Sequence, residues 1–368
     1  MTTAAAKQAQ PSTAYSNFVN TCRSPVTRRH YIKSLEYFMK FLKVDNCDTI
    51  LDFDPKCLQM NICDYIVFLR SKNLASQSIA AYVAAIRKFL DMNDVIALNW
   101  KKIHSFEPEA EQRNEDRPYT NVEIATLLSK SSPRDRAIIL LMASSGVRVG
   151  AIAYPLLLKD LQPIDAHHIF KITVYRKSPS RYYTFCTPEA RRELEAHLDW
   201  RRRLGEQLKD DSPVFRKSFD SPRIQKPVPV TVSSISWNIN NLLKQCGLRS
   251  FAPLTENQSI PKRTEIMRCH GFRKFFETNA FKAGMNNMYI RRLMGQKSNL
   301  EDSYLKLSHS DLLEGDDRHI GYVGIMDSLT IDESQKLRRE VETLRVERSS
   351  WESLREEVNS LKDLLKQP

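Results

Sequence analysis

The chain has 368 residues, which is enough for two domains with a sizeable core. Lysine and arginine number 56 against 44 aspartate and glutamate residues, so the formal charge is +12 and the pI is near 9.3; this excess favours polyanionic partners such as nucleic acid. The longest apolar run, at 137–143, is too short to span a bilayer, and the N-terminus lacks a signal-peptide pattern. We therefore expect a soluble, cytoplasmic protein and exclude an integral membrane protein.

The cysteines are scattered and form no Cys-x-x-Cys pair, which predicts reduced thiols without disulfides or structural zinc. Cys269 stands beside His270, but no second pair lies at a spacing suited to a shared metal ion, so a packed thiol is expected there. We predict neither a metal nor a cofactor. The seven cysteines are Cys22, Cys47, Cys57, Cys63, Cys186, Cys246 and Cys269.

The N-terminal part of the chain predicts a flexible tail followed by a helical domain. Residues 1–22 are rich in Ala, Gln, Ser and Thr and show no apolar period. Residues 23–105 carry apolar residues at helical spacing, with lysines and arginines on the faces expected to be exposed. A solvated helical bundle and a DNA-binding domain both fit this pattern. The predicted helices span 24–43, 56–71, 76–91 and 93–104.

A charged segment without apolar period, residues 106–118, predicts a linker between two domains. The next domain begins with "TNVE", in which Thr120 and Glu123 have the spacing of a capping box at a helix start.

Residues 119–331 predict a mainly helical domain with a small antiparallel hairpin. The hairpin strands are "HIFKITVY" and "RYYTFCT", joined by the basic turn "RKSPS". Residues 249–265 are polar and irregular and predict a long loop. The helices are expected over 120–130, 133–145, 187–205, 232–245, 271–283 and 286–295.

The last segment, residues 332–368, predicts a helical tail with coiled-coil character, because apolar residues alternate at threes and fours among charged ones. A self-associating helix and a single amphipathic helix packed on its own domain both remain open.

Four segments carry residues suited to phosphate chemistry. Arg148 follows Gly146, an expected helix C-cap; Lys177 lies in the hairpin turn; His270 and Arg273 stand three apart at a helix start; and Tyr304 follows. Each alone has an ordinary structural explanation, such as capping, an exposed turn or a core aromatic.

Together and in this order, these residues resemble the tyrosine recombinase (phage integrase) family. "ASSGVRVGAIAYPLLLKDL" is similar to the first conserved box of that family, and "HGFRKFFETNAFKAGMNNMYIRRLMGQ" is similar to the second. "ALNWKKIH", "FCTPEA" and "DSLTIDE" resemble integrases of archaeal mobile elements. The resemblance implies a mainly α fold, in which an N-terminal SAM-like core-binding bundle and a mainly helical catalytic domain with a small β-sheet close around duplex DNA.

The resemblance also implies a reaction, which is the cutting and rejoining of DNA through a 3′-phosphotyrosine intermediate without metal or ATP. Tyr304 is the implied nucleophile, and its phosphotyrosyl ester stores the energy of the broken bond. Arg148 and Arg273 can grip the non-bridging oxygens with planar guanidinium groups and stabilise the pentavalent transition state. Tyr322 is a rival nucleophile at a less suitable spacing.

Three further residues complete the expected site. Lys177 can protonate the departing 5′ oxygen, although Arg176 and Arg181 lie close enough to compete for this assignment, and His270 can assist proton movement near the nucleophile. Gln296 occupies the position where the family has His or Trp. A glutamine amide can donate to a phosphate oxygen but cannot become charged, so lowered activity is expected.

The leading hypothesis is a site-specific recombinase that acts on double-stranded DNA during integration or excision of a mobile element, as a homo-oligomer that forms a synaptic tetramer on DNA. A type IB topoisomerase would use the same chemistry on a single duplex. A DNA-binding protein of the same fold without turnover and a coiled-coil scaffold with incidental basic charge are the alternatives outside catalysis.

Overall fold

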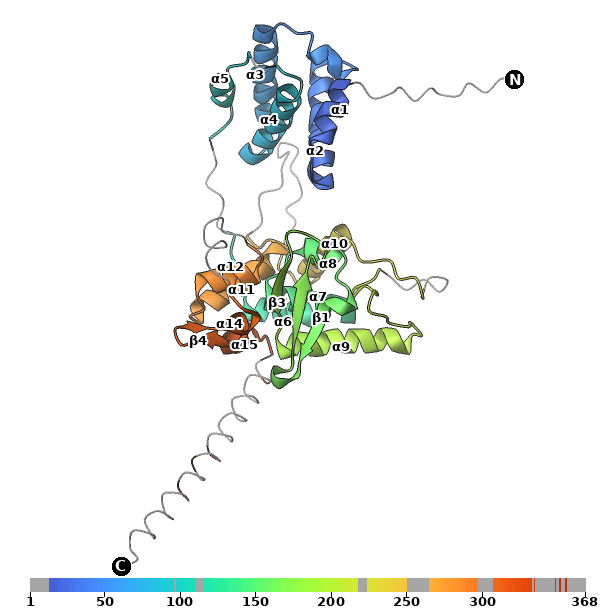
Figure 1. Ribbon diagram of the computed structural model, residues 1–368, viewed down its shortest axis with the longest axis vertical. Helices are drawn as coiled ribbons and strands as arrows, with labels where there is room; N and C mark the ends of the chain where they lie inside the picture. Colours follow the sequence, from blue (N-terminus) through green and yellow to red (C-terminus); the bar gives the residue numbers. More distant parts are fainter. Residues whose placement is uncertain are drawn as a thin grey trace, which may run out of the picture. The chain divides into compact units, whose positions relative to one another are not determined.

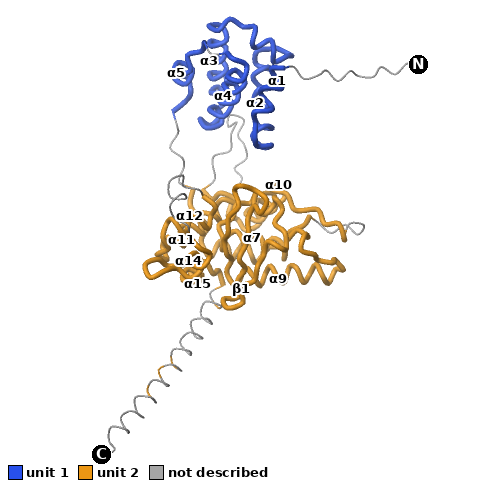
Figure 2. The backbone as a smooth tube through the Cα atoms, viewed as in Figure 1, with its two compact units in different colours: residues 1–114, 252–263 blue, residues 115–251, 264–368 orange. Residues whose placement is uncertain are grey.

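The computed structural model describes residues 13–95, 97–109, 116–217, 224–249, 265–296 and 307–332, with single positions at 334, 348, 351 and 355. The described chain forms two compact units (Figure 2). Described residues up to 109 belong to the first unit, and those from 116 onward belong to the second. None of the helices in these ranges is long and apolar enough to cross a membrane.

The first unit is a bundle of helices, as its apolar periodicity predicts (Figure 1). Ser24 and Asp54 cap the starts of the two longest helices, and a proline follows each cap at the first helical position. The predicted helix over 93–104 is shorter than expected, because Asp94 adopts a left-handed conformation and Asn99 caps a later start. The helices are α1 (Thr13–Asn20), α2 (Pro25–Leu42), the 3-10 helix η1 (Cys47–Ile50), α3 (Pro55–Ser71), α4 (Ser76–Asp91) and α5 (Trp100–His104).

The predicted flexible tail over 1–22 is wrong for its last part. Residues 13–20 form α1, while residues 1–12 lie outside the described chain. Phe18 is fully buried and lies edge-on to Phe89 of α4, with ring centroids 5.7 Å apart. Tyr15, Phe18 and Val19 lie in a segment of only eight residues, which is too short for a recognisable period, so this helix depends on packing against the rest of the unit rather than on its own pattern.

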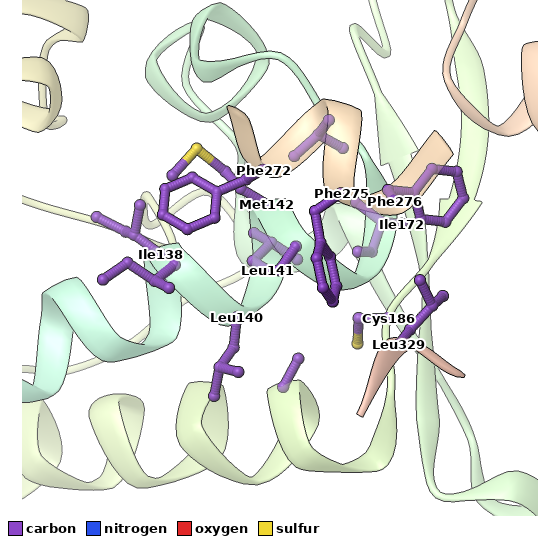
Figure 3. Packing of buried hydrophobic residues seen from close by; sticks show 14 of the residues in the cluster. Ile138, Leu140, Leu141, Met142, Ile172, Cys186, Phe272, Phe275, Phe276 and Leu329 are labelled. Atoms are coloured by element: carbon purple, nitrogen blue, oxygen red, sulfur yellow. The ribbon is translucent and has the colours of Figure 1, made fainter. Parts of the chain in front are cut away.

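The core of the second unit is built around α7 (Pro133–Ser145), whose residues from Ala137 to Ser145 are all buried. The apolar run at 137–143, which is too short to span a bilayer, is therefore part of a central helix surrounded by protein. Helices α9 (Pro188–Arg203) and α11 (His270–Lys282) pack against it. Figure 3 shows Phe272 and Phe275 of α11 among the apolar side chains of α7.

A three-stranded antiparallel sheet, in the order β1-β2-β3, lies in the second unit. The predicted hairpin is confirmed as β2 (Ile169–Val174) and β3 (Tyr182–Phe185), with Ile172 opposite Thr184. The edge strand β1 (Leu161–Ile164) was not predicted from the sequence. It has only four residues and contains Pro163, which cannot donate to a ladder and is tolerated at a sheet edge.

The second unit begins and ends with specific polar contacts. Thr120 and Glu123 form the predicted capping box, with hydrogen bonds of 3.2 and 2.8 Å. Arg117, at the end of the predicted linker, donates to Glu123 at 2.6 Å. At the other end, the backbone N–H of Ile331 donates to Glu189 at 2.9 Å.

The remaining elements of the second unit cover this core. Of the regions predicted from the sequence, residues 110–115 of the linker, 250–264 of the long loop and nearly all of the coiled-coil tail lie outside the described residues. The remaining elements are α6 (Asn121–Ser129), α8 (Val149–Ala153), η2 (Leu158–Asp160), η3 (Asp165–His167), α10 (Val232–Gln245), α12 (Asn287–Leu293), α14 (His309–Glu314), β4 (Gly315–Asp316), β5 (His319–Ile320) and α15 (Tyr322–Leu329).

Candidate active site

Arg148 is positioned by the turn that ends α7. Gly146 is the C-cap, with a left-handed φ of 62°, and a Cβ at this position would lie 2.6 Å from the ring of Phe276. Only glycine fits both the conformation and the space. Arg148 then lies at the N-cap of α8 and is exposed. Within the described residues its guanidinium has no hydrogen bond or ion pair, so its N–H groups are available to an anion.

His270 and Arg273 lie in the first turn of α11, which is fixed by Tyr119. The Tyr119 hydroxyl donates to the carbonyl oxygen of Arg268 at 2.9 Å, and its ring stacks on Phe272 with centroids 4.3 Å apart. A Cβ at Gly271 would lie 2.6 Å from the Tyr119 ring. The glycine of the His-Gly-Phe-Arg motif is therefore required for this close approach.

Arg273 is only 4% exposed, and its guanidinium joins two helix ends. Nη1 donates to the carbonyl oxygen of Gly146 at 2.6 Å, and Nη2 donates to the carbonyl oxygen of Met294 at 2.9 Å. The first carbonyl lies two residues before Arg148, and the second lies two residues before Gln296. A single buried side chain therefore holds together the turns that carry two other candidate residues.

The two arginines also interact electrostatically. Burial, followed by the positive charge of Arg148, lowers the pKa of Arg273 to about 10. Arg273 remains charged at neutral pH, but a second cation nearby raises the energy of that charge. An anion placed between the two guanidinium groups would relieve this repulsion.

The surroundings of His270 favour the neutral form of its imidazole. Desolvation at the start of α11 lowers the pKa of His270, and the charges of Arg273 and Lys274 lower it further. A neutral imidazole can accept a proton at neutral pH.

Gln296 follows a second glycine of positive φ. Gly295 has a φ of 62°, and a Cβ there would lie 2.4 Å from the ring of Tyr182 in β3. The backbone N–H of Gln296 donates to the carbonyl oxygen of Arg291 at 2.9 Å. Gln296 is partly exposed, on the same turn that accepts from Arg273.

The structure distinguishes the three basic residues of the hairpin turn, Arg176, Lys177 and Arg181, that were candidates for the proton donor. Arg176 forms an ion pair with the buried Asp160 and donates to the carbonyl oxygen of Lys159 at 2.6 Å. Arg181 lies over the ring of Tyr183, 5.7 Å from its centroid. Both are occupied by structural contacts, whereas Lys177 is exposed and forms no hydrogen bond or ion pair with the described residues.

Lys177 itself lies toward Asp211. After the larger contribution of Lys159, the charge of Lys177 helps to lower the pKa of the Asp211 carboxyl. The structure thus brings the turns that carry Arg148, His270, Arg273 and Gln296 together, while Lys177 is exposed on the hairpin turn and forms no ion pair with the described residues.

Two tyrosines beside the arginines were not identified from the sequence. Burial raises the pKa of Tyr175 and raises the pKa of Tyr182 to about 12, and the charges of Arg148 and Arg273 oppose both shifts. The two rings pack edge to face, with centroids 6.2 Å apart. The signal available in the sequence was the aromatic residue on each side of the turn in "YRKSPSRYY".

Of the two candidate nucleophiles, Tyr304 and Tyr322, the structure describes only Tyr322. Tyr304 lies outside the described residues. Tyr322 is completely buried, and its hydroxyl donates to the carbonyl oxygen of Ser144 at 2.7 Å. Burial raises the pKa of Tyr322 well above its ordinary value. Tyr322 is thus a core residue, and we no longer consider it a candidate nucleophile.

The described residues contain no group of three or more His, Cys, Asp or Glu side chains arranged to hold a metal ion. The seven cysteines, all within the described ranges, are free thiols. Cys269 is partly buried, and its sulfur lies 3.9 Å from the hydroxyl of Ser236.

No family model matches the sequence, and no curated protein matches it. Solved structures do match. The Tn1549 transposon integrase in complex with transposon right end DNA is 14% identical, with a TM-score of 0.54 over 80% of this chain and 94% of that one. The XerH site-specific recombinase bound to palindromic difH substrate, in a post-cleavage complex, is 16% identical, with a TM-score of 0.52 over 74% of each chain. At these identities the likeness establishes the fold.

Proposed function

We propose that this chain, whose fold is that of the tyrosine recombinases, is a site-specific recombinase that cuts and rejoins duplex DNA through a 3′-phosphotyrosine intermediate. The observation that carries the proposal is the convergence of Arg148 and Arg273, which are 125 positions apart by number (273 minus 148) yet close enough for one charge to lower the pKa of the other. Two neighbouring guanidinium groups, of which that of Arg148 has no hydrogen bond or ion pair among the described residues, suit a phosphodiester.

The arginines would stabilise the transition state. Arg148 and Arg273 would donate to the non-bridging oxygens while negative charge accumulates on them during attack. Arg273 is already held by the carbonyl oxygens of Gly146 and Met294, so its guanidinium needs little reorganisation. The amide of Gln296 would add one neutral donor.

The covalent step would use Tyr304, Lys177 and His270. The Tyr304 oxygen forms a bond to phosphorus, its proton passes to the neutral imidazole of His270, and the 5′ oxygen leaves with a proton from Lys177. The reverse step, with a 5′ hydroxyl as nucleophile, rejoins the strand. Lys177, which is exposed and has no ion pair among the described residues, would reach the phosphate from the hairpin turn to act in this way.

The test is a covalent adduct. Purified protein is incubated with a pool of nicked duplexes of random sequence in EDTA, denatured, and analysed for DNA-linked peptides by mass spectrometry. We expect an adduct at Tyr304, none with Tyr304→Phe, and an adduct with Tyr322→Phe. An adduct at another residue, or equal yields with Tyr304→Phe, would contradict the proposed chemistry.

The proposal extends to partners and domain roles. The first unit would act as the core-binding domain on double-stranded DNA, and residues 332–368 would contribute to a synaptic tetramer that integrates or excises a mobile element. Deleting residues 333–368 is expected to reduce the oligomer formed on DNA, measured by light scattering. Unchanged mass and unchanged recombination would remove the tail from the proposal.

A second candidate function is favoured by Gln296, which lacks the charge and the ring of the family's usual residue. A chain of this fold could bind duplex DNA without cleaving it. In that case binding would weaken steeply with salt, since phosphate contacts release counterions, but no adduct would form and Tyr304→Phe would bind as well as wild type.

A further inference from the structure

Tyr175, the residue after strand β2, has an unfavourable backbone. Its φ is 53°, in the left-handed region. For a residue with a Cβ this conformation is unfavourable, because the Cβ comes close to the following carbonyl oxygen. Such a residue persists when surrounding contacts determine its conformation, and these contacts are often found at functional sites.

The ring of Tyr175 provides such contacts. It packs edge to face with Tyr154, with centroids 5.3 Å apart, and with Tyr182 at 6.2 Å. Its hydroxyl approaches α8 closely, because a Cβ at Gly150 would lie 3.7 Å away from it. Tyr175 is therefore fixed against the helix that begins at Arg148.

The chain on both sides of Lys177 is fixed as well. Arg176 is bound to Asp160, which is only 4% exposed. The backbone N–H of Ser178 donates to the carbonyl oxygen of Tyr175 at 2.8 Å and closes the turn. Lys177, between these fixed neighbours, is exposed, and its side chain forms no hydrogen bond or ion pair with the described residues.

We propose that Tyr175 is a positioning residue for Lys177: its ring ties the hairpin turn to the Arg148 helix and sets the direction from which the lysine reaches a phosphate held by the arginines. This inference rests on the proposed function. The left-handed conformation of Tyr175 turns the chain directly after β2. Lys177 follows two residues later, and the Tyr175 side chain lies close enough to Arg148 and Arg273 to feel the charge of both.

A role in placing Lys177 predicts a dependence on the leaving group. The alkoxide formed by cleavage of an ordinary phosphodiester needs a proton, which Lys177 supplies. A substrate with sulfur in place of the bridging 5′ oxygen releases a thiolate, and thiols are acidic enough, with a pKa of about 8.5 for cysteine, to leave without one. Displacing Lys177 should slow cleavage of the oxygen substrate far more than cleavage of the sulfur substrate.

The experiment compares initial cleavage rates on both substrates for wild type, Tyr175→Gly, Tyr175→Phe and Tyr183→Ala. Glycine removes the ring but favours the left-handed backbone, so folding is retained. We expect Tyr175→Gly to slow the oxygen substrate by about 10- to 100-fold, within the range of general acid catalysis, and to leave the sulfur substrate within about 3-fold of wild type. Tyr175→Phe keeps the ring and should behave as wild type.

Tyr183→Ala is the matched control, because it removes an aromatic ring that contacts Arg181 rather than Tyr175. If Tyr175→Gly unfolds in urea at lower concentration than wild type, Tyr154→Ala provides a second test, since it removes a half-exposed contact of the Tyr175 ring. It should show the same preference for the sulfur substrate.

The experiment distinguishes failure of the Tyr175 role from failure of the proposed function. Equal slowing of both substrates by Tyr175→Gly, or no slowing of either, overturns the positioning role while the recombinase proposal stands. Absence of cleavage of both substrates by wild type, across the pool of duplexes, overturns the proposed function and this inference with it.

Discussion

Arg273 donates a hydrogen bond of 2.6 Å to the carbonyl oxygen of Gly146, at the end of the central helix α7. A second bond, of 2.9 Å, reaches Met294 at the end of α12. The guanidinium group therefore has a structural role in addition to its proposed role in phosphate binding, and this separates it from Arg148, which has no such bonds among the described residues.

The two arginines should respond differently to substitution. Arg273→Ala is expected to lower the free energy of unfolding by about 1–3 kcal/mol, because carbonyl groups lose their donors. Arg148→Ala should change it by less than about 0.5 kcal/mol, as for other exposed residues. Both should reduce strand cleavage by about 100-fold or more. Urea unfolding and adduct formation measure the two effects, and equal destabilisation by both variants would contradict the distinction.

Gln296→His should raise the rate of strand cleavage. On the proposed function, the histidine would supply a ring and a donor that can become charged, and the turn at Gly295 already presents this position beside Arg273. A charged donor to a phosphate is roughly twice as strong as a neutral one, so an increase of about 10-fold is expected. Gln296→Ala should lower the rate, and a fall in rate with Gln296→His would show that the glutamine is suited to this site.

Much of the fold follows from local patterns. Helices with regular apolar spacing, the capping box at Thr120 and the glycine turn at Gly146 were predicted because their signals lie within a few residues. Helix α1 and strand β1 were not, since each is short and depends on distant partners. Phe18 gains its position from contacts with Tyr31 of α2 and Phe89 of α4, and Pro163 gives no strand signal.

In the candidate site, too, features with local sequence signals could be predicted, whereas those that depend on distant residues could not. The arginines and His270 could be selected by their order and spacing, but the partner that removes Arg176 from consideration, Asp160, lies 16 residues away and has no motif. The proximity of Tyr175 and Tyr182 to both arginines likewise depends on how β2 and β3 pack against α8 and α12, which local spacing does not encode.

Tyr322→Phe should lower the stability of the fold without affecting formation of the DNA adduct. The variant loses the hydrogen bond to the carbonyl oxygen of Ser144 but keeps the ring that packs against Phe185. We expect a loss of about 0.5–1.5 kcal/mol in the free energy of unfolding and no change in the adduct yield per folded molecule. Loss of the adduct with unchanged stability would restore Tyr322 as a nucleophile.

The buried His197 should make the folded protein sensitive to acid. Its ring stacks with those of Trp200 and Phe215, and neither ring nitrogen has a hydrogen-bond partner in the described structure. Burial, with the charges of Arg201 and Arg134, lowers the pKa of His197 to about 3. The unfolded chain, with an ordinary histidine pKa of about 6.5, therefore binds a proton that the folded chain does not bind between these pH values.

Stability must then fall as the pH drops below about 6.5, by up to about 1.4 kcal/mol for each pH unit from this residue alone. His197→Phe keeps a ring of similar shape and removes the titration, so between pH 7 and pH 5 it should lose about 2 kcal/mol less than wild type in urea unfolding. The carboxylate of Glu206, bound to Arg201 at 2.6 Å, contributes acid sensitivity to both proteins and cancels in the comparison. Parallel stability curves for the two proteins over this pH range would show that His197 is protonated in the folded state.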